Sequence, residues 1–351
     1  MSSTSSSAEA SVGVQASVPA EPFAPSGPPP LRAPLWALGP HAQTILAHVA
    51  PAPWPALVAG EAGVTAHDIE LPDGDRLRAL HRPGTSGQRV VIFHGLSGDT
   101  GSDYVRLAAA TATARGHSVL AVNHRGCGPG RGLARGMYHS GRGDDCGAVV
   151  GWARRELPPA RHLAIGFSLS GNALLHLLTG GGPEAHWPDG VLAINPPVDL
   201  RACSLALMRG ANRLYQLRFV RRCTRTLEQR AADGLLPEGF EIPRVSTLWD
   251  FDEHVTAPLG GFADAEDYYR RCSTSQRLER IERPTAILHA ADDPFVPASV
   301  FDGLARSAHT HLHLEPTGGH VGYLSSGPLR LRPRRWLLDA IDHYLAALER
   351  A

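Results

Sequence analysis

The chain has 351 residues, of which 43% are hydrophobic and 19% are charged. This length and balance predict a globular protein with a sizeable buried core. Its 34 basic residues equal its 34 acidic residues, so it lacks the basic excess expected of a protein that binds nucleic acid. Every basic residue is arginine, and the missing lysine excludes P-loop nucleotide hydrolases and Schiff-base enzymes.

The composition divides the chain into three parts. Residues 1–30 are rich in Ser, Ala and Pro with almost no large apolar side chains, so we predict a disordered tail. Residues 31–198 and 281–351 alternate between strand and helix patterns and form the predicted core. Residues 199–280 interrupt that alternation with helical spacing and no clear strand, which predicts a helical cap inserted between two strands.

The core begins with alternating apolar residues at 64–82 around Asp73-Gly74, a pattern typical of a β-hairpin. Short apolar runs then predict further strands at 90–93, 119–122, 163–167, 191–194 and 285–289. Helical spacing predicts helices at 104–114, 144–155, 169–178, 297–305 and 334–349, and the longest cap helix at 205–227. Continuous apolar strands separated by helices indicate an α/β fold with a mostly parallel sheet covered on both faces.

The remaining composition signals concern location and metals. Five scattered cysteines without a C-x-x-C pair predict reduced thiols in a cytoplasmic protein, not a zinc site. No apolar run is long enough to span a membrane. Arginines at 213–230 favour a solvated helix face, with peripheral contact to an anionic lipid surface as the alternative. His309, His311 and His313 share one face of a strand, and we expect that face to be exposed and metal-free.

The sharpest local signal is Ser168, at the junction of the predicted strand 163–167 and the helix that follows. Gly166 precedes it, and the small residues Ser170 and Gly171 follow. A nucleophile elbow needs small residues two positions before and after the serine, because strand and helix pack closely there. A plain helix N-cap is the alternative. The strand before Ser168 and the helix after it favour the nucleophile.

A serine nucleophile needs a base and an acid that orients the base, in the chain order Ser, Asp, His for this type of elbow. Asp292 and Asp293 follow the apolar run 285–289, and His320 stands in a Gly-rich loop after the next strand. Strand carboxyl ends are where such sites collect. We expect the backbone N–H groups of Leu169 and Leu96 to form an oxyanion hole.

Many ordered motifs make the chain resemble the YheT-like branch of the α/β-hydrolases, from about residue 31 to the C-terminus. The matching residues are 39–45, 94–98, 123–127, 138–141, 144–145, 166–172, 256–259, 261–269, 292–294 and 318–322. The resemblance implies an α/β-hydrolase fold with a helical cap and a triad of Ser168, Asp293 and His320. Asp293 is preferred to Asp292 because the acid usually lies directly before the turn toward the next helix. The family more often has Gly at position 170, and the added hydroxyl is expected to narrow the site.

These observations predict a serine hydrolase that cleaves carboxylic esters of short- to medium-chain acyl groups through an acyl-enzyme, without cofactor or metal. The partner is a small ester or lipid-like substrate; the sequence leaves the oligomeric state open. An amidase, peptidase or perhydrolase that uses the same three residues is an alternative. A non-catalytic ligand-binding protein is a further alternative, which the intact Ser168, Asp293 and His320 disfavour.

Overall fold

The computed structural model describes residues 21–49, 53–326 and 333–351. Its centre is a sheet with the strand order β1-β2-β4-β3-β5-β6-β7-β8. The pairs β1–β2 and β2–β4 are antiparallel, and all other neighbours are parallel. The strands are β1 Thr65–Glu70, β2 Arg76–Arg82, β3 Gln88–Phe93, β4 Ser118–Val122, β5 Arg161–Phe167, β6 Gly190–Ile194, β7 Thr285–Ala290 and β8 Thr310–Glu315. The predicted hairpin and the mostly parallel sheet are confirmed.

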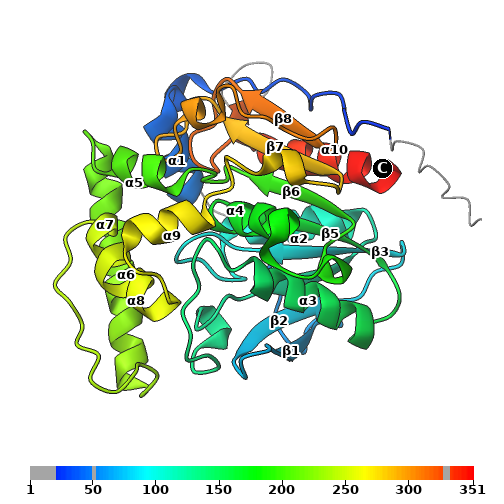
Figure 1. Cartoon of the computed structure of the whole chain (residues 1–351). Coiled ribbons are helices and arrows are strands. Elements are labelled where there is room, and N and C mark those ends of the chain that lie inside the picture. Colours follow the sequence, from blue (N-terminus) through cyan, green and yellow to red (C-terminus); the bar gives the residue numbers. More distant parts are fainter. Residues whose placement is uncertain (1–20, 50–52, 327–332) are drawn as a thin grey trace, which may run out of the picture.

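Helices cover both faces of this sheet, because its central strands are apolar on both sides (Figure 1). In β3, Val90 and Ile92 pack in one cluster with α2 and α10, whereas Val91 and Phe93 pack in another with α3 and α4. This division follows from the two-residue period of a strand. The four helices are α2 Asp103–Ala114, α3 Gly143–Glu156, α4 Leu169–His176 and α10 Trp336–Arg350.

The cap is a group of helices between β6 and β7 that gathers at one end of the sheet (Figure 1). Its helices are α5 Leu200–Leu207, α6 Asn212–Ala232, α7 Leu248–Phe251, α8 Ala257–Gly260 and α9 Ala265–Cys272. The sequence predicted one helix over 205–227, but the structure has a break between α5 and α6. Gly210 lies in this break with a φ of 50°, a conformation that does not continue a right-handed helix.

Two other predicted segments differ from the structure. Residues 297–305 form only the 3-10 turn Ala298–Phe301, and Gly303, with a φ of 67°, follows it closely.

Residues 1–20 of the predicted tail lie outside the described residues. Residues 21–30 lie against the core: the Phe23 side chain is buried with α10, and its N–H donates to the Ala308 carbonyl at 2.9 Å. The Trp336 indole N–H donates to the Pro29 carbonyl, and the His343 ring bonds the Ser26 carbonyl, so α10 holds this segment at several points.

The N-terminal helix α1 Pro40–Val49 packs against the short antiparallel pair β9 Leu324–Ser326 and β10 Pro333–Arg335. Gln43 makes the connection, because its fully buried side chain bonds both backbone groups of Leu324 and the carbonyl of Ala37. Because of these contacts, the segment between β8 and β9, which contains His320, lies directly beside α1.

The remaining 3-10 turns are Leu35–Ala37, Gly128–Gly130, Glu184–His186 and Leu278–Arg280.

Candidate active site

Five neighbouring strands carry the candidate site at their carboxyl ends. Because β3, β5, β6, β7 and β8 are parallel and adjacent, the residues that follow them meet at one edge of the sheet. These residues are, in the same order, Leu96, Ser168, Asn195, Asp293 and His320. Four of the five are residues that the sequence singled out.

Ser168 occupies a strained turn between β5 and α4. Its φ of 51° and ψ of −118° lie outside the regions that residues other than glycine normally adopt. The flanking residues must be small: a Cβ at Gly166 would lie 2.5 Å from the Ser170 carbonyl oxygen, and one at Gly171 would press on Pro196. This tight turn holds the hydroxyl of Ser168 at the strand's end, as the elbow pattern predicts.

The structure brings the three predicted side chains into one hydrogen-bonded chain. The Ser168 Oγ lies 2.8 Å from Nε2 of His320, and Nδ1 of the same ring lies 2.7 Å from Oδ2 of Asp293. Because the Asp293 carboxylate accepts from Nδ1, the neutral ring carries its proton there and leaves Nε2 free to accept from the serine. The arrangement can therefore remove a proton from the Ser168 hydroxyl.

The surroundings of Asp293 keep its carboxyl group ionised. Burial alone raises its pKa, but the nearby His320 and several hydrogen bonds outweigh burial, so the net pKa lies below the ordinary value. The backbone N–H groups of Phe295 and Val296 donate to Oδ1, at 2.8 and 3.1 Å. The side-chain amide of Asn195 donates to Oδ2 at 2.7 Å.

Asp292 lies beside this chain of residues but does not contact the His320 ring in the described hydrogen bonds. Its carboxylate accepts from the hydroxyl of Thr317 and from the N–H of Gly319, both at 2.8 Å. It thus shapes the loop that carries His320. The two neighbouring carboxylates have different partners, and the geometry favours Asp293 as the acid, in line with the sequence preference.

Asn195 and Thr44 also support the site, although neither was expected from the sequence to have a role. Asn195 has a φ of 49° and also bonds the Gly319 carbonyl and the hydroxyl of Tyr323. The hydroxyl of Thr44, on α1, accepts from the N–H of His320 at 2.9 Å. Asn195 has a signal in the sequence, since it directly follows an apolar strand at the edge where the other candidates lie. Thr44 lies in the motif 39–45 that carries the family resemblance, but no local pattern points to its role, because its partner is 276 residues away.

Two backbone N–H groups lie next to Ser168 without a protein acceptor among the described hydrogen bonds. One belongs to Leu169, the first residue of α4, where helical N–H groups have no partner within the helix. The other belongs to Leu96, after β3. The preceding Gly95 lies so close that a Cβ there would be 3.3 Å from that of Ser168. Nδ1 of His94 bonds the Gly95 carbonyl at 2.8 Å. Because the C=O and N–H of a trans peptide point in opposite directions, the Leu96 N–H points away from the His94 ring.

The hydroxyl of Ser170 does not narrow the site, contrary to the expectation from the sequence. Ser170 is fully buried and lines neither cavity near Ser168. Its Oγ donates to the His94 carbonyl and lies 2.6 Å from Nε2 of His124, which must donate because the single hydroxyl proton is used. Burial lowers the pKa of both histidines, so the rings are neutral. Ser170 therefore stabilises the loop that carries Leu96.

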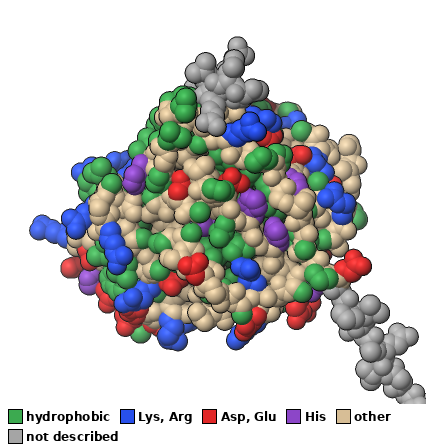
Figure 2. Space-filling view, turned by 90° about the horizontal axis from the view of Figure 1, so that it is seen from above, with side chains coloured by type: hydrophobic (Ala, Val, Ile, Leu, Met, Phe, Trp, Pro, Cys, Tyr) green, Lys and Arg blue, Asp and Glu red, His purple; other side chains and the backbone are tan. Residues whose placement is uncertain are grey.

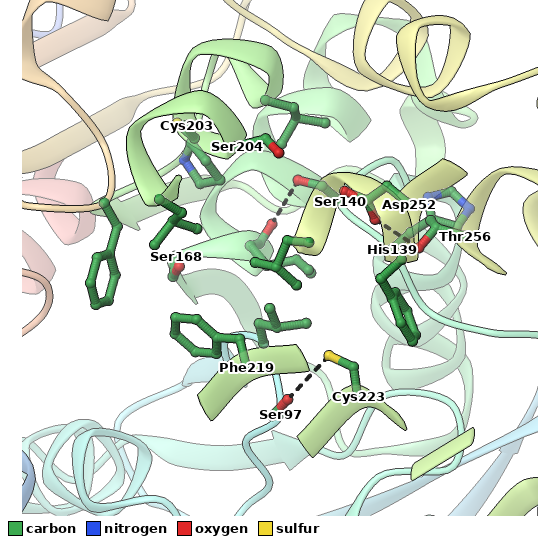
Figure 3. A pocket seen from close by; sticks show the side chains of 18 of the residues that line it. Ser97, His139, Ser140, Ser168, Cys203, Ser204, Phe219, Cys223, Asp252 and Thr256 are labelled. Carbon is green, nitrogen blue, oxygen red and sulfur yellow. Dashed lines mark hydrogen bonds between the residues drawn. The ribbon is translucent and has the colours of Figure 1, made fainter. Parts of the chain in front are cut away.

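Two cavities meet at Ser168 and His320. The narrow cavity, of about 160 Å³, extends beneath the cap and is lined mainly by apolar side chains (Figure 3). The wide cavity, of about 500 Å³, lies toward α1 and α2 and includes Arg218 and Arg222 of α6. Both cavities share six lining residues: Leu96, Ser97, Ser168, Phe219, Phe295 and His320.

The other sequence candidates lie away from these cavities. Among the described residues, no three His, Cys, Asp or Glu side chains are arranged to hold a metal ion. The rings of His311 and His313 are half-buried beside Tyr344 of α10, so the predicted exposed face is wrong for these two residues. In the described part of the chain, no helix has both the length and the apolar character required to cross a bilayer.

The arginines of α6 divide into different environments. Arg230 is buried and donates to the carbonyls of Ala134, Arg135 and Gly136. Arg218 and Arg222 are exposed at the wide cavity. Hydrophobic and basic side chains lie beside one another on the face seen in Figure 2. The predicted solvated face thus describes only part of this helix.

Comparisons with known proteins agree with this architecture. A model of the alpha/beta hydrolase family matches residues 90–334. The Escherichia coli (strain K12) protein named "Putative esterase YheT" is 34% identical over 290 residues, which cover 79% of this chain and 83% of that protein. The monoacylglycerol lipase of Saccharomyces cerevisiae is 28% identical over 269 residues, which cover 73% of this chain and 58% of the lipase.

A solved structure shows the same fold. The esterase Pf2001 of Pyrococcus furiosus has a TM-score of 0.50 at 18% identity, and the match covers 76% of this chain and 88% of the esterase. A likeness at this identity speaks for the fold alone. Together, the family match, the relative at 34% identity and the sheet with its inserted cap establish that the chain belongs to the α/β-hydrolase family, in its YheT-like branch.

Proposed function

We propose that this protein hydrolyses carboxylic esters, with Ser168 as nucleophile, His320 as general base and acid, and Asp293 as the acid that orients His320. The observation that carries the proposal is the continuous hydrogen-bonded chain from Ser168 through His320 to Asp293 on a strained elbow. The names of the bacterial and yeast relatives, an esterase and a lipase, support the same chemistry.

In the proposed reaction, Nε2 of His320 takes the proton of the Ser168 hydroxyl while Oγ attacks the ester carbonyl carbon. The N–H groups of Leu96 and Leu169 donate to the negative oxygen that forms. The His320 ring then gives its proton to the departing alkoxide, which leaves an acyl group on Oγ. Water, deprotonated by the same ring, attacks this acyl group and releases the acid and free Ser168.

The two cavities suit the two halves of an ester. The narrow apolar cavity fits the acyl group, because burial of its methylenes is favourable there. The wide cavity fits the alcohol, which must depart before water can attack. The rim of the wide cavity reaches solvent, since the lining residues Ile45 and Val49 are 47% and 68% exposed. His320 lines both cavities and can therefore protonate an alkoxide on the wide side.

The proposal is tested with p-nitrophenyl esters from acetate to decanoate on the wild type, Ser168→Ala and the control Ser299→Ala. Ser299 is exposed on the 3-10 turn Ala298–Phe301 and lies outside both cavities. We expect turnover by the wild type and the control, and a loss of about 10⁴-fold or more in kcat for Ser168→Ala. A fluorophosphonate probe is expected to label the wild type once, at Ser168.

Three results would overturn all or part of the proposal. Ser168→Ala that retains wild-type rates would place the nucleophile elsewhere. A wild type that neither cleaves any ester nor reacts with the fluorophosphonate would favour the non-catalytic alternative. Labelling of Ser168 without ester turnover would overturn the ester assignment and direct the search to amides and peracids.

A further inference from the structure

The far wall of the narrow cavity is polar, although most of its lining is apolar. Four side chains from three cap segments form this wall, which we call the distal subsite: Asp252, Thr256, Tyr269 and Ser204. Asp252 and Thr256 stand at the two ends of the turn after α7, while Tyr269 belongs to α9 and Ser204 to α5. In Figure 3, Asp252 and Thr256 lie across the cavity from Ser168.

Hydrogen bonds within the distal subsite leave the Asp252 carboxylate with free acceptor positions. The hydroxyl of Thr256 donates to Oδ1 and the hydroxyl of Tyr269 donates to Oδ2, both at 2.8 Å. The Tyr269 proton is thereby used, so Ser204, 3.1 Å away, donates to the Tyr269 oxygen. Each carboxylate oxygen accepts about two hydrogen bonds, and one position on each is still open. The half-buried Asp252 lines the cavity and can offer these positions to a ligand.

The part of the chain that the structure describes places no cation beside this carboxylate. Within the described residues, Asp252 forms no ion pair, and the lining of the narrow cavity includes no arginine. Burial raises the pKa of Asp252 to about 6, so it is mostly ionised at neutral pH at a cost to stability. An asparagine side chain has the same shape and has hydrogen-bonding groups that can join α7 and α9. It would avoid the cost of a buried charge. The packing of the cap therefore does not explain the carboxylate.

A hydrogen-bond donor adjoins the same cavity. Nδ1 of His139 accepts from the N–H of Gly141 at 3.2 Å, so the neutral ring carries its proton on Nε2. His139 lines the cavity and, in Figure 3, lies on the same side as Asp252 and Thr256. A group that both donates to a carboxylate and accepts from an N–H suits this combination, and a hydroxyl group is the smallest such group.

We propose that Asp252 is a specificity-determining residue that accepts a hydrogen bond from a hydroxyl group at the far end of the substrate's acyl chain. This inference rests on the proposed function, because it places the acyl chain in the narrow cavity. The substrates it assigns are esters of ω-hydroxylated acids. A plain alkyl chain of the same length leaves the carboxylate desolvated and without a ligand donor, and is therefore bound less well.

The test compares methyl esters of hexanoic, octanoic and decanoic acids with the matching ω-hydroxy esters, followed by titration of the released acid. The enzymes are the wild type, Asp252→Asn, Asp252→Leu and the control Asp233→Asn, whose carboxylate pairs with Arg131 on the surface. At the best chain length, we expect the ratio of kcat/KM for hydroxy over plain ester to fall about tenfold in Asp252→Asn. Asp252→Leu is expected to prefer the plain ester, and the control to keep the wild-type ratio.

A second measurement needs no variant and therefore no assumption about folding. The wild type is given hydroxy isomers of the best-length ester with the hydroxyl at the chain end or one to three carbons earlier. We expect the terminal isomer to have the highest kcat/KM by about tenfold, because only that hydroxyl reaches Asp252. Equal values for all isomers would overturn the inference, as would a stronger preference for an ω-ammonium ester.

Failure of this inference differs from failure of the proposed function. If plain esters are cleaved, Ser168 is labelled and the hydroxy-to-plain ratio is the same in the wild type and both Asp252 variants, then only the distal subsite is refuted. If no ester is cleaved and the fluorophosphonate leaves Ser168 unmodified, then the proposed function fails and the inference fails with it.

Discussion

The two cavities share one nucleophile but differ in what surrounds them. The narrow cavity is enclosed by cap helices and ends at a single carboxylate, Asp252. The wide cavity is bordered by α1, by the loop before α2 and by the exposed face of α6, with acidic and basic side chains mixed. In an enclosed cavity, each atom added to the substrate meets closely packed side chains. At an exposed wall, side chains can rearrange and their charges are screened by solvent. We therefore expect strict selection of the acyl group and loose selection of the alcohol.

The largest effect should come from a change to the residues that both cavities share, which lowers turnover without altering the selection of acyl group or alcohol. Asp293→Asn is expected to lower kcat by about 10⁴-fold for every combination of acyl group and alcohol, because the amide stabilises the wrong tautomer of His320. Asp292→Asn is the matched control and should cost less than about tenfold, since its partners are Thr317 and Gly319. Steady-state rates over a grid of esters decide the matter, and equal losses in the two variants would refute the assignment of Asp293.

A second change should affect the acyl side alone. Cys203 on α5 is buried at the narrow cavity, and Cys203→Phe reduces the space for the acyl chain. We expect about 10- to 100-fold lower kcat/KM on the longest accepted acyl ester and little change on acetate. Cys203→Ala should move the preference toward longer chains. A uniform loss for all acyl lengths would mean that the chain does not lie in this cavity.

Removal of the charge at the end of the narrow cavity should stabilise the fold. The pKa of Asp252 is raised from 3.8 in the unfolded chain to about 6 in the fold. Ionised Asp252 therefore destabilises the fold above pH 6, and this penalty is absent below about pH 4. Asp252→Asn should be more stable than the wild type by about 2 kcal/mol at pH 8, and the gain should shrink as pH falls from 6 to 4. Thermal unfolding of both proteins between pH 4 and 8 tests the sign, and an unstable Asn variant at pH 8 would contradict it.

The smallest effect should appear on the wide side. Arg218 and Arg222 are exposed there, so each should contribute only about threefold in kcat/KM to esters whose alcohol carries a negative charge. Arg218→Ala and Arg222→Ala are compared with Arg225→Ala, which lies on the same helix away from this cavity. High salt should abolish the difference. The same loss with a neutral alcohol would exclude an electrostatic cause.

Much of the fold could be predicted because its signals are local. Strands β3 to β7 are apolar on both faces, and the helices between them repeat at helical spacing, so both patterns are visible in short windows. The errors in the helices have local causes as well: Gly210 and Gly303 adopt positive φ and interrupt segments whose apolar spacing predicts continuous helix. Phe23 illustrates the opposite case, a single apolar residue in a polar segment that is buried by a distant helix.

The sequence by itself predicted the class of the site, because an elbow serine and an acid follow apolar strands, a histidine stands in the Gly-rich loop after the next strand, and parallel strands bring such positions to one edge. Only the tertiary structure decided which residues support them. Thr44 meets His320 across 276 residues, Ser170 turns into the core toward His94 and His124, and Asp252 faces a cavity formed by separate cap helices. These contacts depend on packing between distant segments, which leaves no periodic or local pattern in the chain.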